Sequence, residues 1–239
     1  MRVIIYGDVH GCLDEFKTLR HELEISGEDR EISVGDLLDR GEESNATLQY
    51  ARENGIELVL GNHEYKYLRF KRHEEKFKLT GKKNPMNFDD EKVKIYENLS
   101  QEDLDYIEAA PFFLKIDNVT ILHAGITNKI DLSNATKKEL ESLIRIRDLD
   151  INEKTLSLGQ TPFGSRPWSE FYDGGEGYIV YGHEARSKVK IDKYSFGIDT
   201  GCVYGNKLTA LIIHDTQEPM FHYDIVQVRA RMAYSTNKS

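Results

Sequence analysis

The sequence is poor in cysteine, proline and tryptophan, since its 239 residues include two cysteines, five prolines and one tryptophan. Cys12 and Cys202 are too few for the disulfide framework of a small secreted protein, and their spacing matches no common zinc motif. No apolar run reaches the ~20 residues that a membrane-spanning helix needs. We expect no secretory leader, because the first predicted strand starts almost at Met1. We therefore expect a cytoplasmic protein with no membrane partner. An inert, packed thiol is the favoured interpretation of Cys12, and a redox-sensing role is the alternative.

The sequence also lacks an excess of positive charge. It has 32 Lys and Arg residues against 41 Asp and Glu residues, which gives a formal net charge of -9 at pH 7. Proteins that bind nucleic acids or anionic membranes do so mainly through Lys and Arg that neutralise phosphates, so we expect no stable nucleic-acid binding. The length and the 39% hydrophobic content suffice for one core. We expect a single domain over residues 1–239, and the sequence indicates no oligomeric state.

Five short polar motifs are present, and each follows an apolar segment that predicts a buried strand. They are GDVHG at 7–11, GDLLDRG at 35–41, GNHE at 61–64, LHAG at 122–125 and YGH at 181–183. Helical spacing over 13–23 and over 44–54, with Ser44 as the expected N-cap, places helices between the first three strands. Alternating strands and helices predict a parallel sheet. Because ligands bind at the carboxyl ends of such strands, we expect the motifs to meet at one edge.

The remaining segments predict less regular elements. Residues 65–110 read as a helical insertion beside the site, with one charged helix and a second helical run that Pro111 closes. Strands are expected at 177–183, 195–201 and 208–215. We expect the last two to form an antiparallel hairpin, because GCVYGNK between them has turn residues. Residues 233–239 are expected to be a frayed tail.

The motifs supply the side chains that two adjacent divalent metals need. Asp8 and His10 can turn toward one ion, and the Asp36 carboxylate can bridge two. Asn62, His123 and His183 would complete the second ion. Oxygen and imidazole ligands without a thiolate suit borderline divalent ions, so we expect manganese first, with iron, zinc, nickel and cobalt as alternatives. Two metals about 3.5–4 Å apart can clamp the attacking and leaving oxygens of an in-line displacement at phosphorus.

Together, these five motifs resemble those of the calcineurin-like metallophosphoesterases, within the branch of the phosphoprotein phosphatases and the bacterial bis(5'-nucleosyl)-tetraphosphatases. HAGIT and GIDTGCVYGNKLTAL are also similar to the bacterial members. The resemblance runs from residue 3 to about 213. It implies a four-layer α/β sandwich, with two mixed sheets flanked by helices, and a metal-dependent phosphatase that acts by metal-bound hydroxide.

The resemblance also implies roles for individual residues. The metal ligands would be Asp8, His10, Asp36, Asn62, His123 and His183, and Asn62 would also contact the substrate phosphate. His63 would protonate the leaving oxygen, and Asp39 would orient its imidazole, which agrees with the chemistry of a carboxylate-paired general acid. Arg40 would bind the nonbridging phosphate oxygens through its planar fork. Arg147 and Arg166 stand where further phosphate-binding arginines are expected.

Two motif details bear on the substrate. Nuclease-type members carry a second histidine two residues after the GH histidine, whereas Ala185 stands there in this chain, which argues against a nuclease. Nucleotide-cleaving bacterial members often have alanine where this chain has Asp39. This difference favours a serine/threonine-type protein phosphatase over the alternative, a bis(5'-nucleosyl)-tetraphosphatase. The partner is then a phosphorylated protein or a nucleotide. A catalytically retired phosphate-binding module is the alternative from another class, and the intact ligand set argues against it.

Two groups of side chains remain open to more than one interpretation. The basic residues between Lys66 and Lys78 could guide a polyanionic nucleotide or an RNA end. Glu74 and Glu75 interrupt them, so a solvated helix face is the favoured interpretation. Trp168, Phe171 and Tyr172 could stack on a base or pack beneath the site.

Overall fold

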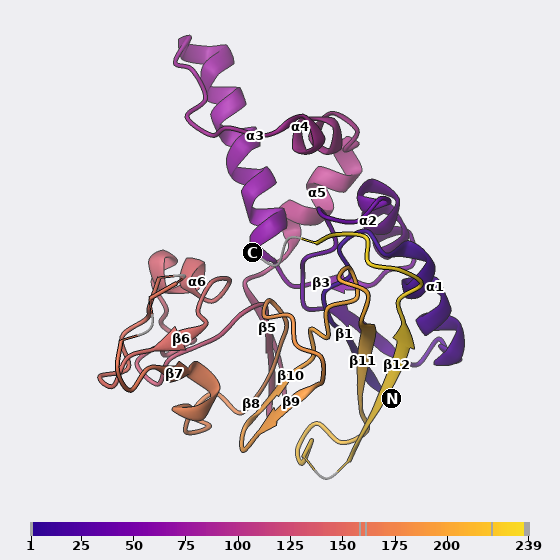
Figure 1. Cartoon of the computed structure of the whole chain (residues 1–239), viewed down its shortest axis with the longest axis vertical. Coiled ribbons are helices and arrows are strands. Elements are labelled where there is room, and N and C mark those ends of the chain that lie inside the picture. Colours follow the sequence, from indigo (N-terminus) through magenta and orange to yellow (C-terminus); the bar gives the residue numbers. More distant parts are fainter. Residues whose placement is uncertain (1, 158, 161, 221, 237–239) are drawn as a thin grey trace.

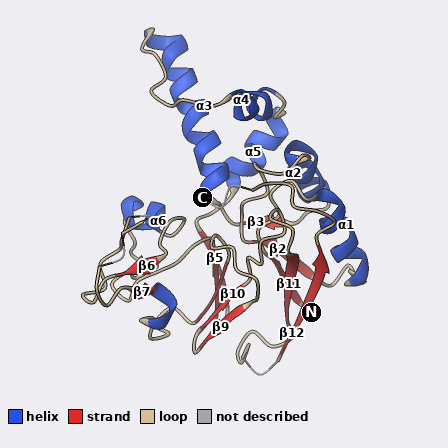
Figure 2. Ribbon diagram, viewed as in Figure 1, coloured by secondary structure: helices blue, strands red, loops and turns tan. Residues whose placement is uncertain are grey.

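The computed structural model describes residues 2–157, 159–160, 162–220 and 222–236. Two five-stranded sheets form its centre (Figures 1 and 2). The first has the order β12-β11-β1-β2-β3 and is built from β1 (Val3–Tyr6), β2 (Arg30–Ser33), β3 (Glu57–Leu58), β11 (Lys207–Ile213) and β12 (Tyr223–Arg229). The second has the order β4-β5-β8-β10-β9 and contains β4 (Phe113–Ile116), β5 (Val119–Leu122), β8 (Tyr178–Tyr181), β9 (Lys190–Asp192) and β10 (Ser195–Gly197).

Helices and a small sheet cover the outer faces of the two central sheets. The helices are α1 (Leu13–Glu22), α2 (Ser44–Glu53), α3 (Asn62–Thr80), α4 (Asp90–Glu97), α5 (Gln101–Ala109) and α6 (Lys137–Ser142). The small sheet pairs β6 (Asp148–Leu149) with β7 (Arg166–Pro167), and the 3-10 helix η1 (Trp168–Glu170) follows it. Figure 1 shows α1 and α2 beside the first sheet, α6 and the small sheet at the opposite side, and α3 extending beyond the other helices.

Three apolar clusters hold these layers together. Ile4 and Tyr6 point outward from β1 and pack with Phe16 of α1. Their neighbours Val3 and Ile5 point to the other face, where they join residues of the second sheet. The third cluster includes Trp168 and lies on the outer side of the second sheet. Alternate residues of one strand thus face two different apolar layers, and the predicted four-layer α/β sandwich with two mixed sheets is confirmed.

Parallel pairing places the first motifs together. β1 pairs in parallel with β2, and β2 with β3. β5 and β8 are also parallel neighbours in the second sheet. Their carboxyl ends therefore deliver the motif residues from each sheet to a shared region.

Three local predictions differ from the structure. The predicted hairpin between 195–201 and 208–215 is wrong, because β10 pairs with β8 and β9 whereas β11 pairs with β1 and β12. Turn residues allow a reversal, but they do not fix which sheet receives the next strand. Ser44 is the first residue of α2 rather than its N-cap, since its hydroxyl donates to the Gly41 carbonyl.

The C-terminal segment is held against the fold as far as Ser235. Tyr234 donates a backbone hydrogen bond to the Val203 carbonyl at 2.9 Å, and Ala233 forms a bridge with Tyr204. The Ser235 backbone N–H also donates to the Val203 carbonyl, at 3.0 Å, so the predicted fraying is wrong for residues 233–235. Residues 237–239 lie outside the described residues. Among the helices of the described ranges, none has the length and apolar character to cross a bilayer.

Candidate metal centre

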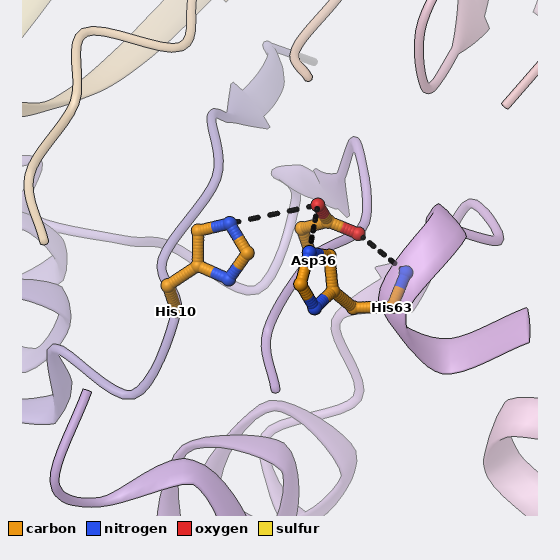
Figure 3. Close-up of side chains that lie close together, drawn as sticks. All are labelled: His10, Asp36 and His63. Carbon is orange, nitrogen blue, oxygen red and sulfur yellow. Dashed lines mark hydrogen bonds and ion pairs between the residues drawn. The ribbon is translucent and has the colours of Figure 1, made fainter. Parts of the chain in front are cut away.

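The Asp36 carboxylate lies at the meeting point of three histidines. Its Oδ2 is 3.5 Å from Nε2 of His10, 3.4 Å from Nε2 of His123 and 3.8 Å from Nε2 of His63. Figure 3 shows the His10 and His63 rings converging on this carboxylate from a loop and from the start of α3. The His63 backbone N–H donates to Oδ1 of Asp36 at 3.0 Å, which fixes the other oxygen toward the imidazoles.

Asp36 belongs to two groups of candidate metal ligands. One contains His10 and His63, the other His123 and His183, and within each group the donor atoms lie within 4.8 Å of one another. Asn62 connects the second pair, because its Oδ1 is 2.9 Å from Nε2 of His123 and 2.7 Å from Nδ1 of His183. A carboxylate shared by two groups of imidazoles is able to hold divalent ions.

Asp8 lies beside these groups, although in the described ranges it belongs to neither of them. Its two carboxylate oxygens accept the backbone N–H of His183 at 3.1 and 3.0 Å. Gly182 leaves room for this contact, since a Cβ there would lie 1.9 Å from Oδ1 of Asp8. Motifs from the first and second sheets thus touch at this point.

The charges of the site suit a cation. Burial lowers the pKa of His10 to about 3, and burial together with His123 lowers that of His183. Both imidazoles are therefore neutral and have a lone pair to donate. Burial and the neighbouring carboxylates of Asp199 and Asp36 raise the pKa of Asp8 well above its usual value. A divalent ion would relieve this repulsion, and the carboxylate, imidazole and amide donors fit it without thiolates.

Strained backbone holds the candidate residues in place. His10, Asp36, Asp39, Arg40 and His183 all have positive φ, between 47° and 72°. This region costs an ordinary residue about 1–2 kcal/mol, and such strain concentrates at functional sites. The fold therefore holds these residues in unfavourable backbone conformations, which orient their side chains.

His63 forms a buried pair with Asp39. Its Nδ1 lies 2.5 Å from Oδ2 of Asp39, whose other oxygen accepts the Tyr67 hydroxyl. Burial opposes ionisation of Asp39, but the hydrogen bonds from His63 and Tyr67 lower its pKa. The carboxylate fixes the His63 tautomer and leaves Nε2 facing the cluster, as a proton donor to a leaving group requires.

The three candidate arginines have different surroundings. Arg40 contacts the Tyr204 hydroxyl, and its Nη2 is 3.3 Å from Nε2 of His63. The Nε of Arg147 donates to Nε2 of His183 at 2.9 Å. These two arginines lie at the cluster. Arg166 does not, because its guanidinium lies over the ring of Phe171 and 3.9 Å from the Glu170 carboxylate.

Two buried carboxylates near the centre were not among the predicted site residues. Glu64, the last residue of GNHE, accepts the backbone N–H groups of Asp36, Leu37 and Leu38 at 2.8–3.0 Å. It thereby holds the loop that carries Asp36 and Asp39. Asp199 accepts the Gly201 N–H at 2.9 Å, and burial raises its pKa to about 6. One indication in the sequence pointed to these residues as part of the site: Glu64 lies within GNHE, and Asp199 lies within GIDTG.

A cavity of about 870 Å³ opens directly from Asn62 and His183. Its charged lining residues come from α3, α6 and the segment after α6: Lys66, Arg69, Lys138, Arg145, Arg147, Glu141 and Asp148. Five are cationic and two acidic, so this lining has a formal charge of +3 in a chain of net charge -9. The cavity has the size of a small-molecule site and the charge preference of an anion site.

The open questions about the basic stretch and the aromatic group now have structural answers. Lys66 and Arg69 line the cavity, whereas Lys71 pairs with Glu108 at 3.0 Å on the surface. Lys66 and Arg69 therefore border the cavity as well as solvent, whereas Lys76 and Lys78, farther along α3, are exposed as the favoured interpretation expects. Trp168 is buried in the third apolar cluster and donates its indole N–H to the Ala124 carbonyl at 3.0 Å. It packs beneath the site.

A protein-family model for calcineurin-like phosphoesterases matches residues 1–187. The chain belongs to the calcineurin-like phosphoesterase family. Members of this family are metal-dependent hydrolases of phosphate esters, so the predicted family and enzyme class are confirmed.

The curated relatives of this phosphoesterase carry nucleotide-related names. The asymmetrical bis(5'-nucleosyl)-tetraphosphatase PrpE of Oceanobacillus iheyensis is 29% identical over 88% of each chain. The PrpE of Geobacillus sp. (strain WCH70) is 30% identical over 88% of this chain and 89% of its own. The symmetrical bis(5'-nucleosyl)-tetraphosphatase of Vibrio campbellii is 26% identical over 91% of this chain and 97% of its own.

Solved structures agree with the fold. A crystal structure described as a candidate diadenosine tetraphosphatase superposes with a TM-score of 0.76 at 25% identity, and it covers 96% of this chain and 93% of its own. A serine/threonine phosphatase from Saccharomyces cerevisiae superposes with a TM-score of 0.61 at 15% identity, and it covers 96% of this chain and 80% of its own. The second similarity concerns the fold alone.

Proposed function

We propose that this phosphoesterase hydrolyses dinucleoside polyphosphates, as a bis(5'-nucleosyl)-tetraphosphatase, at a phosphoanhydride bond held over the metal centre. The cavity that joins Asn62 and His183 to five cationic side chains carries the proposal. The names of the relatives support it. The predicted preference for phosphoproteins rested on Asp39, and the comparisons favour the predicted alternative instead.

The charge and the size of the cavity both suit a polyphosphate. A phosphoserine needs charge neutralisation at one phosphate, which the centre and Arg40 can supply. A tetraphosphate chain extends over several phosphates, and Lys66, Arg69, Arg145 and Lys138 continue the positive charge away from the centre. Exposed cations arranged along an anion raise both its affinity and its rate of capture.

The residues of the centre then divide the catalytic work. We assign Asp8, His10, Asp36, Asn62, His123 and His183 as ligands of two divalent ions, with manganese as the first expectation. Such ions neutralise phosphate charge and activate water for attack on phosphorus.

The side chains around the ligands bind the phosphate and move the proton. His63 gives its Nε2 proton to the leaving phosphate oxygen, while Asp39 holds the ring through its hydrogen bond with Nδ1. Arg40 binds nonbridging oxygens through its fork, and Arg147 binds the same phosphate beside His183.

The wild-type protein tests this function directly. With manganese added, kcat/KM for diadenosine tetraphosphate is compared with that for a phosphoserine peptide and for an aryl phosphate. We expect the dinucleotide to be preferred by at least about a hundredfold over both others. If the phosphopeptide is hydrolysed with the same kcat/KM as the dinucleotide, the substrate assignment is wrong. If none of the three compounds is hydrolysed, the assignment of the site as catalytic is wrong.

A further inference from the structure

A further group of candidate metal-ligating side chains lies beside the catalytic cluster and shares no residue with it. Cys12 immediately precedes α1, Glu15 is in the first turn of that helix, and Cys202 is in the loop after β10. Each of the three is about 1% exposed. Their donor atoms, two thiol sulfurs and a carboxylate oxygen, lie within 4.8 Å of one another. None of the three belongs to the catalytic assignment above.

The Glu15 carboxylate is held by one oxygen and unsatisfied at the other. Its Oε1 accepts the backbone N–H of Arg231 at 2.9 Å and the Tyr234 hydroxyl at 2.8 Å. Its Oε2 is buried without a hydrogen-bond partner. Leaving a buried acceptor unpaired costs about 1–3 kcal/mol, and more when the group is charged. A carboxylate fixed in this way is preorganised to donate a lone pair of Oε2 to a cation.

Neither the hydrogen bonds of the two thiols nor a disulfide between them would satisfy the Glu15 carboxylate. The Cys12 thiol donates weakly to the His10 carbonyl at 3.8 Å rather than to Glu15, and both cysteines are free. A hydrogen bond with the Cys12 thiol and burial raise the pKa of the Cys202 thiol. A disulfide would use both sulfurs and still leave Oε2 unpaired. One cation satisfies all three groups.

We propose that Cys12, Glu15 and Cys202 bind one thiophilic divalent cation of the zinc class. Two thiolates and a carboxylate form a donor set that such ions take in proteins, with water at the fourth position. Each thiol loses its proton to water as the sulfur binds the ion.

The site would join three segments: the start of α1 two residues beyond His10, the loop three residues beyond Asp199, and the C-terminal segment through Tyr234. Its role is to stabilise this corner of the fold beside the catalytic centre. The proposal does not depend on the identity of the substrate.

Cobalt(II) tests the site, because a thiolate–cobalt bond gives a near-ultraviolet charge-transfer band that imidazole and carboxylate ligands do not give. Co²⁺ is added to the reduced full-length protein without oxygen, and the spectrum is followed until it is constant, since the site is buried. We expect the band in the wild-type protein and in Asp36→Asn, in which the catalytic cluster is disrupted. We expect the band to be absent in Cys202→Ser. In Glu15→Gln, a higher Co²⁺ concentration should be needed to give the same band intensity.

Thermal unfolding in the presence of zinc supplies a second measurement, which does not depend on the cobalt spectrum. Zn²⁺ at about a hundred times its Kd should raise the Tm of Asp36→Asn by about 5 °C or more, because the ion binds only the folded state. The same addition should leave Cys202→Ser in the Asp36→Asn background unchanged. A wild-type protein without the cobalt band, or a band that persists in Cys202→Ser, would overturn the proposal. So would a Cys12–Cys202 disulfide in protein isolated without oxidant.

Discussion

The buried cluster of candidate metal ligands and the rim of the cavity are built on different physical principles. The rim consists of the cationic lining residues Lys66, Arg69, Lys138 and Arg145. Asp36 and His123 are 2% and 0% exposed, and backbone groups of neighbouring loops fix their orientation. Arg69, Lys138 and Arg145 are exposed and project from helical segments and short connections. The cluster determines which bond can be broken, whereas the rim determines which molecule is brought to it. Loss of a metal ligand or of its support should therefore affect all substrates equally, whereas changes in the rim should affect the dinucleotide more than the aryl phosphate.

Removing the shared carboxylate should have the largest effect. Asp36→Ala deletes the group that both sets of histidines face, so we expect bound manganese and turnover of every substrate to fall below detection. Metal content by elemental analysis and turnover of diadenosine tetraphosphate and aryl phosphate measure this. Full retention of both ions would show that Asp36 does not bridge them.

His63→Ala should come next. We expect kcat to fall by about 10²–10⁴ for a substrate with a poor leaving group, because the proton donor is lost, while bound metal stays near the wild-type level. An aryl phosphate with an acidic phenol needs little protonation and should lose less. If His63→Ala and Asp36→Ala lose metal equally, His63 is a ligand rather than the acid.

Glu64→Gln weakens the support of the cluster without touching the substrate. An amide oxygen replaces only part of the acceptor capacity for three backbone N–H groups, so the free energy of unfolding should fall by ~1–3 kcal/mol. Denaturant unfolding measures this change. Activity should fall by one common factor for all substrates, and a loss confined to diadenosine tetraphosphate would place Glu64 with the rim.

Arg145→Ala is expected to have the smallest effect of the four. The side chain lines the cavity and is exposed, so losing one charge-assisted phosphate contact should raise KM for diadenosine tetraphosphate about tenfold. Steady-state kinetics should show kcat and the kinetics with aryl phosphate within about twofold of wild type. A matching loss for the aryl phosphate would move Arg145 into the catalytic set.

The cluster was largely predictable because each motif follows a buried strand and the ends of parallel strands meet. His10, Asp36 and His123 needed only that argument to be placed together. Glu64 and Asp199 were missed, because a carboxylate that binds backbone N–H groups has no spacing that distinguishes it from a surface acid.

The path of the chain from β10 to β11 and the charge of the cavity depend on tertiary packing. The turn residues between those strands are compatible with a hairpin as well as with the observed crossing between sheets. Lys66 and Lys71 look alike in the sequence, but only the packing of α3 beside α6 separates a lining residue from a surface ion pair.

The division of labour between cluster and rim is tested most directly by the double variant Lys66→Ala/Arg69→Ala. The kcat/KM values for diadenosine tetraphosphate and for an aryl phosphate are measured in parallel, with Lys76→Ala/Lys78→Ala, which removes two exposed charges farther along α3, as the matched control. We predict a loss of about a hundredfold for the dinucleotide, less than twofold for the aryl phosphate, and no change in the control. An equal loss for both substrates, or no loss for either, would contradict the account.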